Sequence, residues 1–356
     1  MRRAAGLTTI AVVLAASTQA NAADAITLTL GGRIKEFFFV ASQTQAPAES
    51  LNSTGMLNDA RISVDGRTVL DNGITVRAFV RFNAVGREAA DVDEAYVDII
   101  SGFGRLRMGE KAGVNTTTIG DPVPQAFLGV DEEIIADALK PRTGIALRDG
   151  FTFKRFTRNA LGVSYQSPEL LGVKVGVAYH PSITPQVGTI DAALNVHDAV
   201  DVTAGYDGDF SGGTYRIAGG YFRLASRVGG NDGGQAWNIS AGATYGGLEV
   251  AAAYINSQPS SGRDEDAWTV GAHYGIGPFQ VSADYRSAKR RPLPRALTLL
   301  PARIFNEHFK RATLQTAYKL GPGVSLGLAG FYATQVDALG VDWDGGGMLS
   351  GIKVEF

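Results

Sequence analysis

The stretch Val173-Lys174-Val175-Gly176-Val177-Ala178-Tyr179-His180 decides the fold, because its larger apolar side chains occupy every odd position. A period of two is the pattern of a β-strand with one apolar face. Similar runs of about 10 residues recur along the chain, and tilted strands of this length can cross a bilayer. Together they predict an all-β protein with sixteen antiparallel strands. The predicted strands cover residues 26–40, 58–69, 74–84, 92–101, 104–111, 158–167, 173–180, 198–207, 214–224, 237–245, 248–254, 268–274, 279–286, 311–320, 324–332 and 348–356.

The connections between these runs alternate between short and long. Asp71-Asn72-Gly73, Gly102-Phe103-Gly104, residues 208–213 and Gly321-Pro322-Gly323 are short and consist largely of residues that suit tight turns. Short turns at one end and long loops at the other are typical of outer-membrane barrels. A soluble β-sandwich would also alternate, but it would not sort its connections by length. The predicted fold is therefore a transmembrane antiparallel β-barrel.

The composition excludes several other classes of protein. The 356-residue chain has 45 glycines, four methionines and no cysteine, so it is not a small disulfide-stabilised scaffold. Beyond the N-terminus it has no run of about 18 apolar residues, which a membrane-spanning helix would need. Its net charge of −2 provides no basic excess for a nucleic-acid binder, whose affinity comes largely from neutralising phosphates.

Residues 1–22 are predicted to be a secretory signal peptide. Arg2 and Arg3 form its positive end, residues 7–16 its apolar core, and Ala20-Asn21-Ala22 its cleavage pattern. Cleavage would leave residues 23–356 as the barrel. It would remove two of the 33 basic side chains and leave 31 against 35 acidic ones, a net charge of −4. The predicted location is the bacterial outer membrane, crossed many times by one chain.

Both faces of the predicted strands fit a barrel in lipid. Aromatic residues have the apolar parity and lie near strand ends, as in the girdles at membrane interfaces. Inward glycines predict a wide, wet lumen, with only isolated inward aromatic residues such as Tyr96 and Phe222. The outward aromatic residues are Tyr165, Tyr179, Tyr206, Tyr215, Tyr221, Trp237, Tyr245, Tyr254, Trp268, Tyr274, Phe279, Tyr285, Tyr318 and Tyr332. The inward glycines are Gly176, Gly205, Gly220, Gly242, Gly271 and Gly327.

The longest connection, residues 112–157, is the third long loop, and it is predicted to fold back into the lumen. Residues 130–139 within it have the pattern of a short helix, with Asp131 as its cap and acidic residues in the first turn. From residue 121 to residue 137 the loop has no Lys or Arg, and its carboxylates are Asp121, Asp131, Glu132, Glu133 and Asp137. In one interpretation these acids line a pore constriction, and in the other they serve the helix end alone.

Arginines on the early strands would face this loop. Parity places six of them on the lumen side: Arg33, Arg61, Arg77, Arg81, Arg105 and Arg107. An arginine facing lipid at mid-depth would cost about 2–4 kcal/mol, which supports the inward assignment. A basic wall opposite an acidic loop would set up a transverse field across a narrow aqueous gap. The alternative is that these arginines solvate an open lumen and pair with wall acids such as Asp65, Glu94 and Asp98.

Three segments and the C-terminus resemble a known family. The segments are Asp93-Glu94-Ala95-Tyr96-Val97, Gly102-Phe103-Gly104-Arg105-Leu106-Arg107-Met108-Gly109 and Arg158-Asn159-Ala160-Leu161-Gly162-Val163-Ser164-Tyr165-Gln166-Ser167-Pro168-Glu169, and the last strand ends in Phe356. With them the mature chain resembles the Gram-negative general porins, which are sixteen-stranded trimeric diffusion channels. The resemblance implies that the terminal aromatic residue helps the assembly machinery to recognise the barrel and that the third loop sets the pore size. The short Pro-Glu-Phe-Gly-Gly-type loop tip of better-known members is missing.

The predicted function is an outer-membrane channel for passive diffusion of small hydrophilic solutes and ions. The four histidines are scattered, and no enzymatic motif or cofactor site is predicted. Asp337, Asp342 and Asp344 could hold calcium, although solvated loop charge is the favoured account. One alternative function is a substrate-selective channel with a ladder of aromatic and ionic side chains. The other, from a different class, is a barrel-anchored enzyme or adhesin.

The outward residues of the first five strands are aliphatic or small, with no Tyr or Trp among them. Interfacial Tyr and Trp are favoured where strands meet lipid headgroups, so this part of the wall is expected to meet protein. Closed cyclic symmetry is the usual arrangement of homo-oligomers, and a homotrimer is expected from the resemblance. Outer-membrane lipid would surround the rest of the wall. The alternative is a lipid-facing wall that happens to lack aromatic residues.

Overall fold

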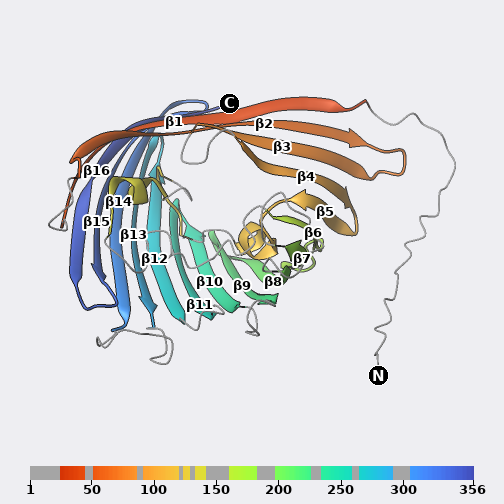
Figure 1. Cartoon of the computed structure of the whole chain (residues 1–356). Coiled ribbons are helices and arrows are strands. Elements are labelled where there is room, and N and C mark those ends of the chain that lie inside the picture. Colours follow the sequence, from red (N-terminus) through yellow and green to blue (C-terminus); the bar gives the residue numbers. More distant parts are fainter. Residues whose placement is uncertain are drawn as a thin grey trace, which may run out of the picture.

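The computed structural model describes residues 25–44, 51–85, 91–119, 123–128, 133–141, 160–182, 197–225, 234–258, 264–291 and 305–356. Sixteen antiparallel strands pair in chain order, and the first also pairs with the last, so the sheet closes into the predicted barrel (Figure 1). The strands are β1 (Thr27–Gln43), β2 (Thr54–Val69), β3 (Thr75–Val85), β4 (Asp91–Ser101), β5 (Gly104–Glu110), β6 (Leu161–Gln166), β7 (Val173–Ser182), β8 (His197–Phe210), β9 (Gly213–Ala225), β10 (Gln235–Tyr245), β11 (Leu248–Gln258), β12 (Glu265–Ile276), β13 (Phe279–Arg290), β14 (Glu307–Gly321), β15 (Val324–Val336) and β16 (Asp342–Glu355). The third loop contains the π-helix η1 (Asn115–Ile119) and the α-helix α1 (Glu133–Ala138). In the described part of the chain, neither helix has the length and apolar character needed to span a bilayer.

The seam between β1 and β16 joins the two ends of the described chain. The Phe356 N–H donates to the Gly32 carbonyl at 3.0 Å, and the Gly32 N–H donates to the Phe356 carbonyl at 2.8 Å. Pairing then continues along the seam from Arg33 and Glu355 to Gln43 and Gly345. Because every strand has two neighbours, no sheet edge is left open for pairing with another chain.

The short turns are tighter than the sequence predicted. β8 continues through Phe210, so the turn predicted over residues 208–213 consists only of Ser211 and Gly212. Gly212 has φ of 83°, in the left-handed region that glycine adopts without steric cost. At the long-loop end several strands extend past their predicted bounds. β16, for example, begins at Asp342 instead of residue 348, because polar and glycine residues there hide the alternation.

The outer surface carries the two predicted groups of aromatic residues. Towards the long loops, Trp237 lies against Tyr254 with ring centroids 5.2 Å apart. Next to the short turns, Phe279 and Tyr318 meet edge to face at 4.8 Å. Between these levels the outward positions are mostly aliphatic, as expected for a wall that faces hydrocarbon.

An apolar cluster fills one side of the interior. Inward side chains of β1, such as Phe37 and Phe39, pack with inward residues of β11 to β16 and with apolar residues of the third loop. Figure 1 shows α1 inside the barrel beside β14 to β16. The predicted wide, wet lumen therefore needs correction, because the loop and this cluster occupy part of its cross-section.

Candidate functional site

The third loop is anchored to the inner wall at its beginning. The backbone N–H of Asn115 in η1 donates to Asp201 Oδ2 on β8 at 2.7 Å. The side chains of Asn115 and Asn238 on β10 form two amide hydrogen bonds, at 2.8 and 3.3 Å. All three residues are buried, so these bonds replace contacts with water that the groups have lost. The first turn of the loop is thereby held over β8 to β10.

A second anchor holds residues 123–128. Gln315 on β14 is 1% exposed, and its Oε1 accepts the backbone N–H groups of Phe127 at 3.2 Å and Leu128 at 2.9 Å. Ser282 Oγ on β13 accepts the N–H of Ala126 at 2.9 Å. These strand side chains satisfy backbone groups that have no partner within the loop itself. The loop therefore lies along the wall in this segment.

Glycines on the strands make room for the loop. A Cβ atom built on Gly327 of β15 would lie 2.1 Å from the Phe127 ring, and one on Gly271 of β12 would lie 2.3 Å from Val123. Gly220 on β9 faces the amide of Asn115 in the same way. We call Gly220, Gly271 and Gly327, with Ser282 and Gln315, the loop floor. The inward glycines were interpreted as open space, and the structure shows that these three accommodate loop side chains.

The later part of the loop reaches β1. Ile134 and Ile135 of α1 are buried in the apolar cluster with Phe37 and Phe39. The backbone N–H of Lys140 donates to Gln43 Oε1 at 2.7 Å. The third loop thus follows the inner wall from β8 to β15 and on to β1, which confirms that it folds into the lumen.

Arginines and carboxylates line the inner side of β1 to β5. Arg33 Nη2 lies 2.8 Å from Asp59 Oδ2, and Arg61 bridges Asp59 and Asp93 at 3.3 and 3.7 Å. Arg81 pairs with Asp93 and, at 2.7 Å, with Glu94. We call this surface, with Arg77, Arg105, Arg107 and Lys111 described below, the arginine wall. Its arginines therefore pair with wall acids, as the alternative interpretation expected.

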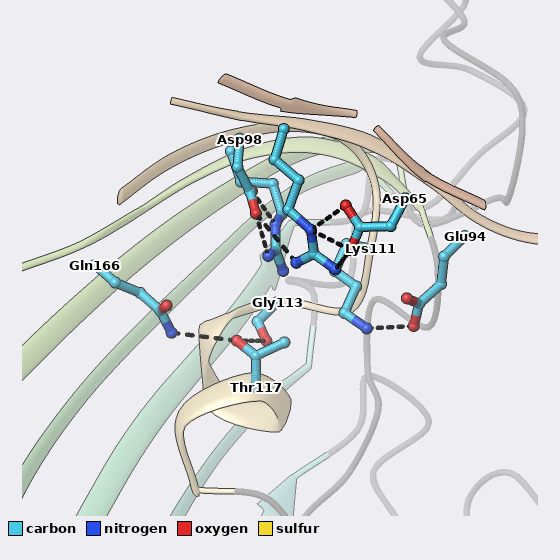
Figure 2. Close-up of polar contacts among 9 residues, drawn as sticks. Asp65, Glu94, Asp98, Lys111, Gly113, Thr117 and Gln166 are labelled. Atoms are coloured by element: carbon cyan, nitrogen blue, oxygen red, sulfur yellow. Dashed lines mark hydrogen bonds and ion pairs between the residues drawn. The ribbon is translucent and has the colours of Figure 1, made fainter. Parts of the chain in front are cut away.

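Asp98 is the fully buried centre of one such group, shown in Figure 2. Arg107 donates to it through Nε at 2.6 Å and Nη2 at 2.9 Å. Arg77 Nη1 lies 3.8 Å from the same carboxylate and donates through Nε to Asp65 at 2.8 Å. Bidentate geometry of this kind fixes the guanidinium planes as well as their charge. The side chains of Arg77 and Arg107 are therefore held in defined positions on the lumen wall.

Aromatic rings support the same arginines. Tyr96 and Phe79 stack with centroids 5.0 Å apart, and the Arg107 guanidinium lies 3.9 Å from the Tyr96 ring centroid. The prediction that Tyr96 is an isolated inward aromatic residue is wrong, because parity along β4 alone does not reveal its neighbour on β3. Tyr96 is only 8% exposed, so its ring supports cations instead of lining the water-filled space.

Lys111 begins the third loop beside the arginine wall. Its Nζ contacts Glu94, which also accepts from Arg81. Burial lowers the pKa of Lys111, and the adjacent Glu94 carboxylate opposes that shift. Arg105 also faces inward, and among the described residues it forms no ion pair. Counted with Arg33, Arg61, Arg77, Arg81 and Arg107, this gives seven basic groups against Asp59, Asp65, Asp93, Glu94 and Asp98.

The predicted loop acids lie mostly outside this description. Asp121, Asp131 and Glu132 fall outside the described residues, and so does the predicted cap of the helix. Glu133 and Asp137 are in α1, which confirms that the segment is helical over Glu133–Ala138. Their role opposite the arginine wall stays a prediction.

A second group of inward charges was missed in the sequence. On β13, Arg286 and Asp284 are 3.4 Å apart, and Arg311 of β14 lies 3.8 Å from the same carboxylate. All three side chains are nearly inaccessible. Charges at alternate positions of an otherwise apolar run are the signal that could have identified them, because alternate residues share one face.

The wall opposite β3 contains an open cavity of about 560 Å³. It is lined by Pro124 of the third loop and by residues of β8 to β11, including Asp207, Asp209 and Glu249. Its main basic residue is Arg216, 3.6 Å from Asp207. The lumen therefore has an acidic surface across from the arginine wall, formed by strand residues that the sequence interpretation did not single out.

The aspartates considered for calcium interact with their own chain. Asp337 Oδ1 accepts the N–H groups of Leu339 and Val341, both at 2.9 Å. Asp344 accepts from the Thr44 and Tyr332 hydroxyls. Over the described ranges, no three His, Cys, Asp or Glu side chains are grouped as a metal site would require.

Comparison with known proteins gives a consistent result. The sequence matches the protein family described as Gram-negative porin over residues 8–338. No curated protein sequence matches the chain significantly. Among solved structures, the anion-selective porin from Comamonas acidovorans is 16% identical and has a TM-score of 0.65, covering 93% of this chain and 100% of its own. The trimer form of OmpT, an outer membrane protein of Vibrio cholerae, is 14% identical with a TM-score of 0.63, covering 94% and 100%. A mutant of Rh. blastica porin is 15% identical with a TM-score of 0.57, covering 93% and 100%.

Proposed function

Because the chain belongs to the Gram-negative porin family and forms an outer-membrane channel, we propose that small hydrophilic solutes and ions cross its lumen by passive diffusion. The observation that carries this proposal is the arrangement inside the closed barrel. The third loop narrows the lumen along one wall, whereas Arg33, Arg61, Arg77 and Arg81 keep 22–26% of their side-chain surface open to solvent. Water and charge therefore share the remaining space.

The arginine wall filters by charge. Pairing with Asp59, Asp65 and Asp93 turns much of its charge into short-range dipoles, which orient polar solutes at close range. The excess of basic groups attracts anions along this wall. On the opposite wall the acidic cavity near Asp207 attracts cations. The acids of the third loop, Asp121, Asp131, Glu132, Glu133 and Asp137, complete the constriction in this proposal.

We assign no catalytic step and no cofactor to the channel. His180 is buried against the carbonyl of Ala160 at 3.3 Å, and His273 contacts Gln280 at 2.6 Å, so both histidines have structural partners. A substrate-selective channel would need aromatic rings exposed along the path. Tyr96 and Phe222 are both buried, which argues against that alternative.

The working form is a homotrimer in outer-membrane lipid. One structural neighbour is described as a trimer form, and the face without Tyr or Trp on β1 to β5 is the surface available for such contacts. Lipid covers the aromatic-bearing wall of the later strands.

Conductance in planar bilayers tests the proposal directly. Purified protein should give stepwise, stable currents, and the reversal potential in a salt gradient should report the balance between the two charged walls. Bilayers that stay electrically silent after verified insertion would contradict passive diffusion. A circular dichroism spectrum dominated by helix would contradict the barrel itself.

A further inference from the structure

One carboxylate on the outer surface is out of place. Glu36 is the tenth of the 17 residues of β1, and it lies between the outward residues Ile34 and Phe38. In register it faces Asn58 on β2 and Ile352 on β16. Neither Glu36 nor Asn58 makes a hydrogen bond or ion pair with any other residue that the structure describes.

Other outward charges in the described strands lie within four residues of a long-loop end, where water can reach them. Examples are Asp198 on β8, Arg223 on β9, Asp266 on β12, Lys310 on β14 and Asp344 on β16. Glu36 is seven residues from Gln43, the last residue of β1. It is therefore placed at the depth of the apolar band instead of at its border.

The surface around Glu36 is apolar and lacks the residues typical of a lipid interface. Barrel closure places β16 next to β1, so the outward face without Tyr or Trp extends over β16 and β1 to β5. We call this surface the aliphatic face. Leu28 and Met56 are 72% and 71% exposed on it. Ionisable groups at membrane depth are costly and are rarely left facing lipid.

We propose that the aliphatic face binds a second copy of this chain and that Glu36 of one copy pairs there with the Asn58 carboxamide of the next. The outward surface around Glu36 carries no Lys or Arg, whereas the Asn58 amide can donate two hydrogen bonds to a carboxylate. Because the two residues lie on adjacent strands, three copies around one axis can form a closed ring of such pairs. Buried polar contacts of this kind fix the register of an otherwise non-directional apolar contact.

This inference rests on the self-association proposed above and does not depend on conduction. The chain contains no cysteine, so single-cysteine variants carry one defined label. Glu36→Cys and a control, Ala283→Cys, are each labelled with a fluorophore and reconstituted into vesicles that contain lipids with nitroxide on their acyl chains. Ala283 is an exposed outward residue between Phe279 and Tyr285 on the aromatic-bearing wall.

The label at residue 36 should lose most of the quenching that the label at residue 283 shows. Equal quenching at both positions would overturn the proposal, because Glu36 would then face lipid. The conductance of the same vesicle protein is measured in parallel. Loss of current with the quenching difference preserved would count against the channel function alone.

Charge reversal tests the contact without a label. Glu36→Lys should run as a monomer in mild detergent without heating, while still shifting in mobility on heating as a folded barrel does. Ala283→Lys should remain oligomeric. An unchanged dissociation temperature for Glu36→Lys would overturn the proposal.

The pairing partner is tested by mixing chains. Glu36→Cys and Asn58→Cys proteins are refolded separately and together, and then oxidised. A covalent two-chain product found mainly in the mixture would support the Glu36 and Asn58 pair. Cross-linking of the Glu36→Cys protein with itself to the same extent would overturn that pair.

Discussion

The arginine wall and the loop floor face the same lumen with different residues. On the arginine wall, long charged side chains pair with each other, as Arg77 does with Asp65. On the loop floor, glycines and short polar side chains lie beneath the third loop, as Gly327 does beneath Phe127. The first surface excludes the loop by its bulk and charge. The second accepts it because its residues are small and offer acceptors for loop N–H groups.

The two surfaces also differ in what they contribute to stability. Partly exposed ion pairs such as Arg33 and Asp59 are worth roughly 0–1 kcal/mol each, so the arginine wall contributes charge more than stability. Removing Gln315 would strand two buried N–H groups, at a cost of about 1–3 kcal/mol. We therefore expect substitutions on the loop floor to move the loop, and substitutions on the arginine wall to change selectivity.

The largest effect is expected from filling the loop floor. Gly327→Leu places a side chain where the Phe127 ring lies, and overpacking of this kind costs about 1–3 kcal/mol or more. Segment 123–128 should move into the lumen and reduce or destabilise the single-channel current. Gly330→Leu is the matched control, because Gly330 lies on the same strand with no atom within 4 Å of an added Cβ. Equal currents in both variants would show that the loop is not positioned by the floor.

An intermediate effect is expected on the arginine wall. Replacing Arg77 and Arg81 with Ser leaves Asp65 and Asp93 without these partners, so the reversal potential should shift towards cations. Replacing Glu132 and Glu133 with Gln should shift it the other way if the loop acids belong to the constriction. Thermal stability should change little in the arginine variant. Identical reversal potentials in all three proteins would leave these arginines as ordinary lumen charge.

The smallest effect is expected from loosening one anchor. Gln315→Leu removes the acceptor for the N–H groups of Phe127 and Leu128 but leaves the glycines of the floor in place. Open-channel noise should rise while the mean conductance stays close to that of the wild type. Gln280→Leu, on a neighbouring strand and away from these loop contacts, is the control. A quiet channel in the Gln315 variant would show that glycine packing alone holds this segment.

The sequence alone was sufficient for the barrel because each strand carries its own signal. The period of two in stretches such as Val173–Ser182, the glycines at the short turns and the outward aromatic residues are all local features. The position of the third loop and the inward parity of Arg77 and Arg81 followed from the same pattern. Strand ends such as Asp342 were missed because polar residues above the membrane do not need to alternate.

Only the tertiary structure decided which residues meet. The pairing of Arg107 with Asp98 depends on the register between β4 and β5, and the fit of Phe127 over Gly327 joins residues 200 positions apart. The surroundings of Glu36 depend on closure, because its neighbour Ile352 comes from the other end of the chain. Periodicity tells which face of a strand a side chain occupies. The partner on that face is set by register and closure, which are properties of the assembled sheet.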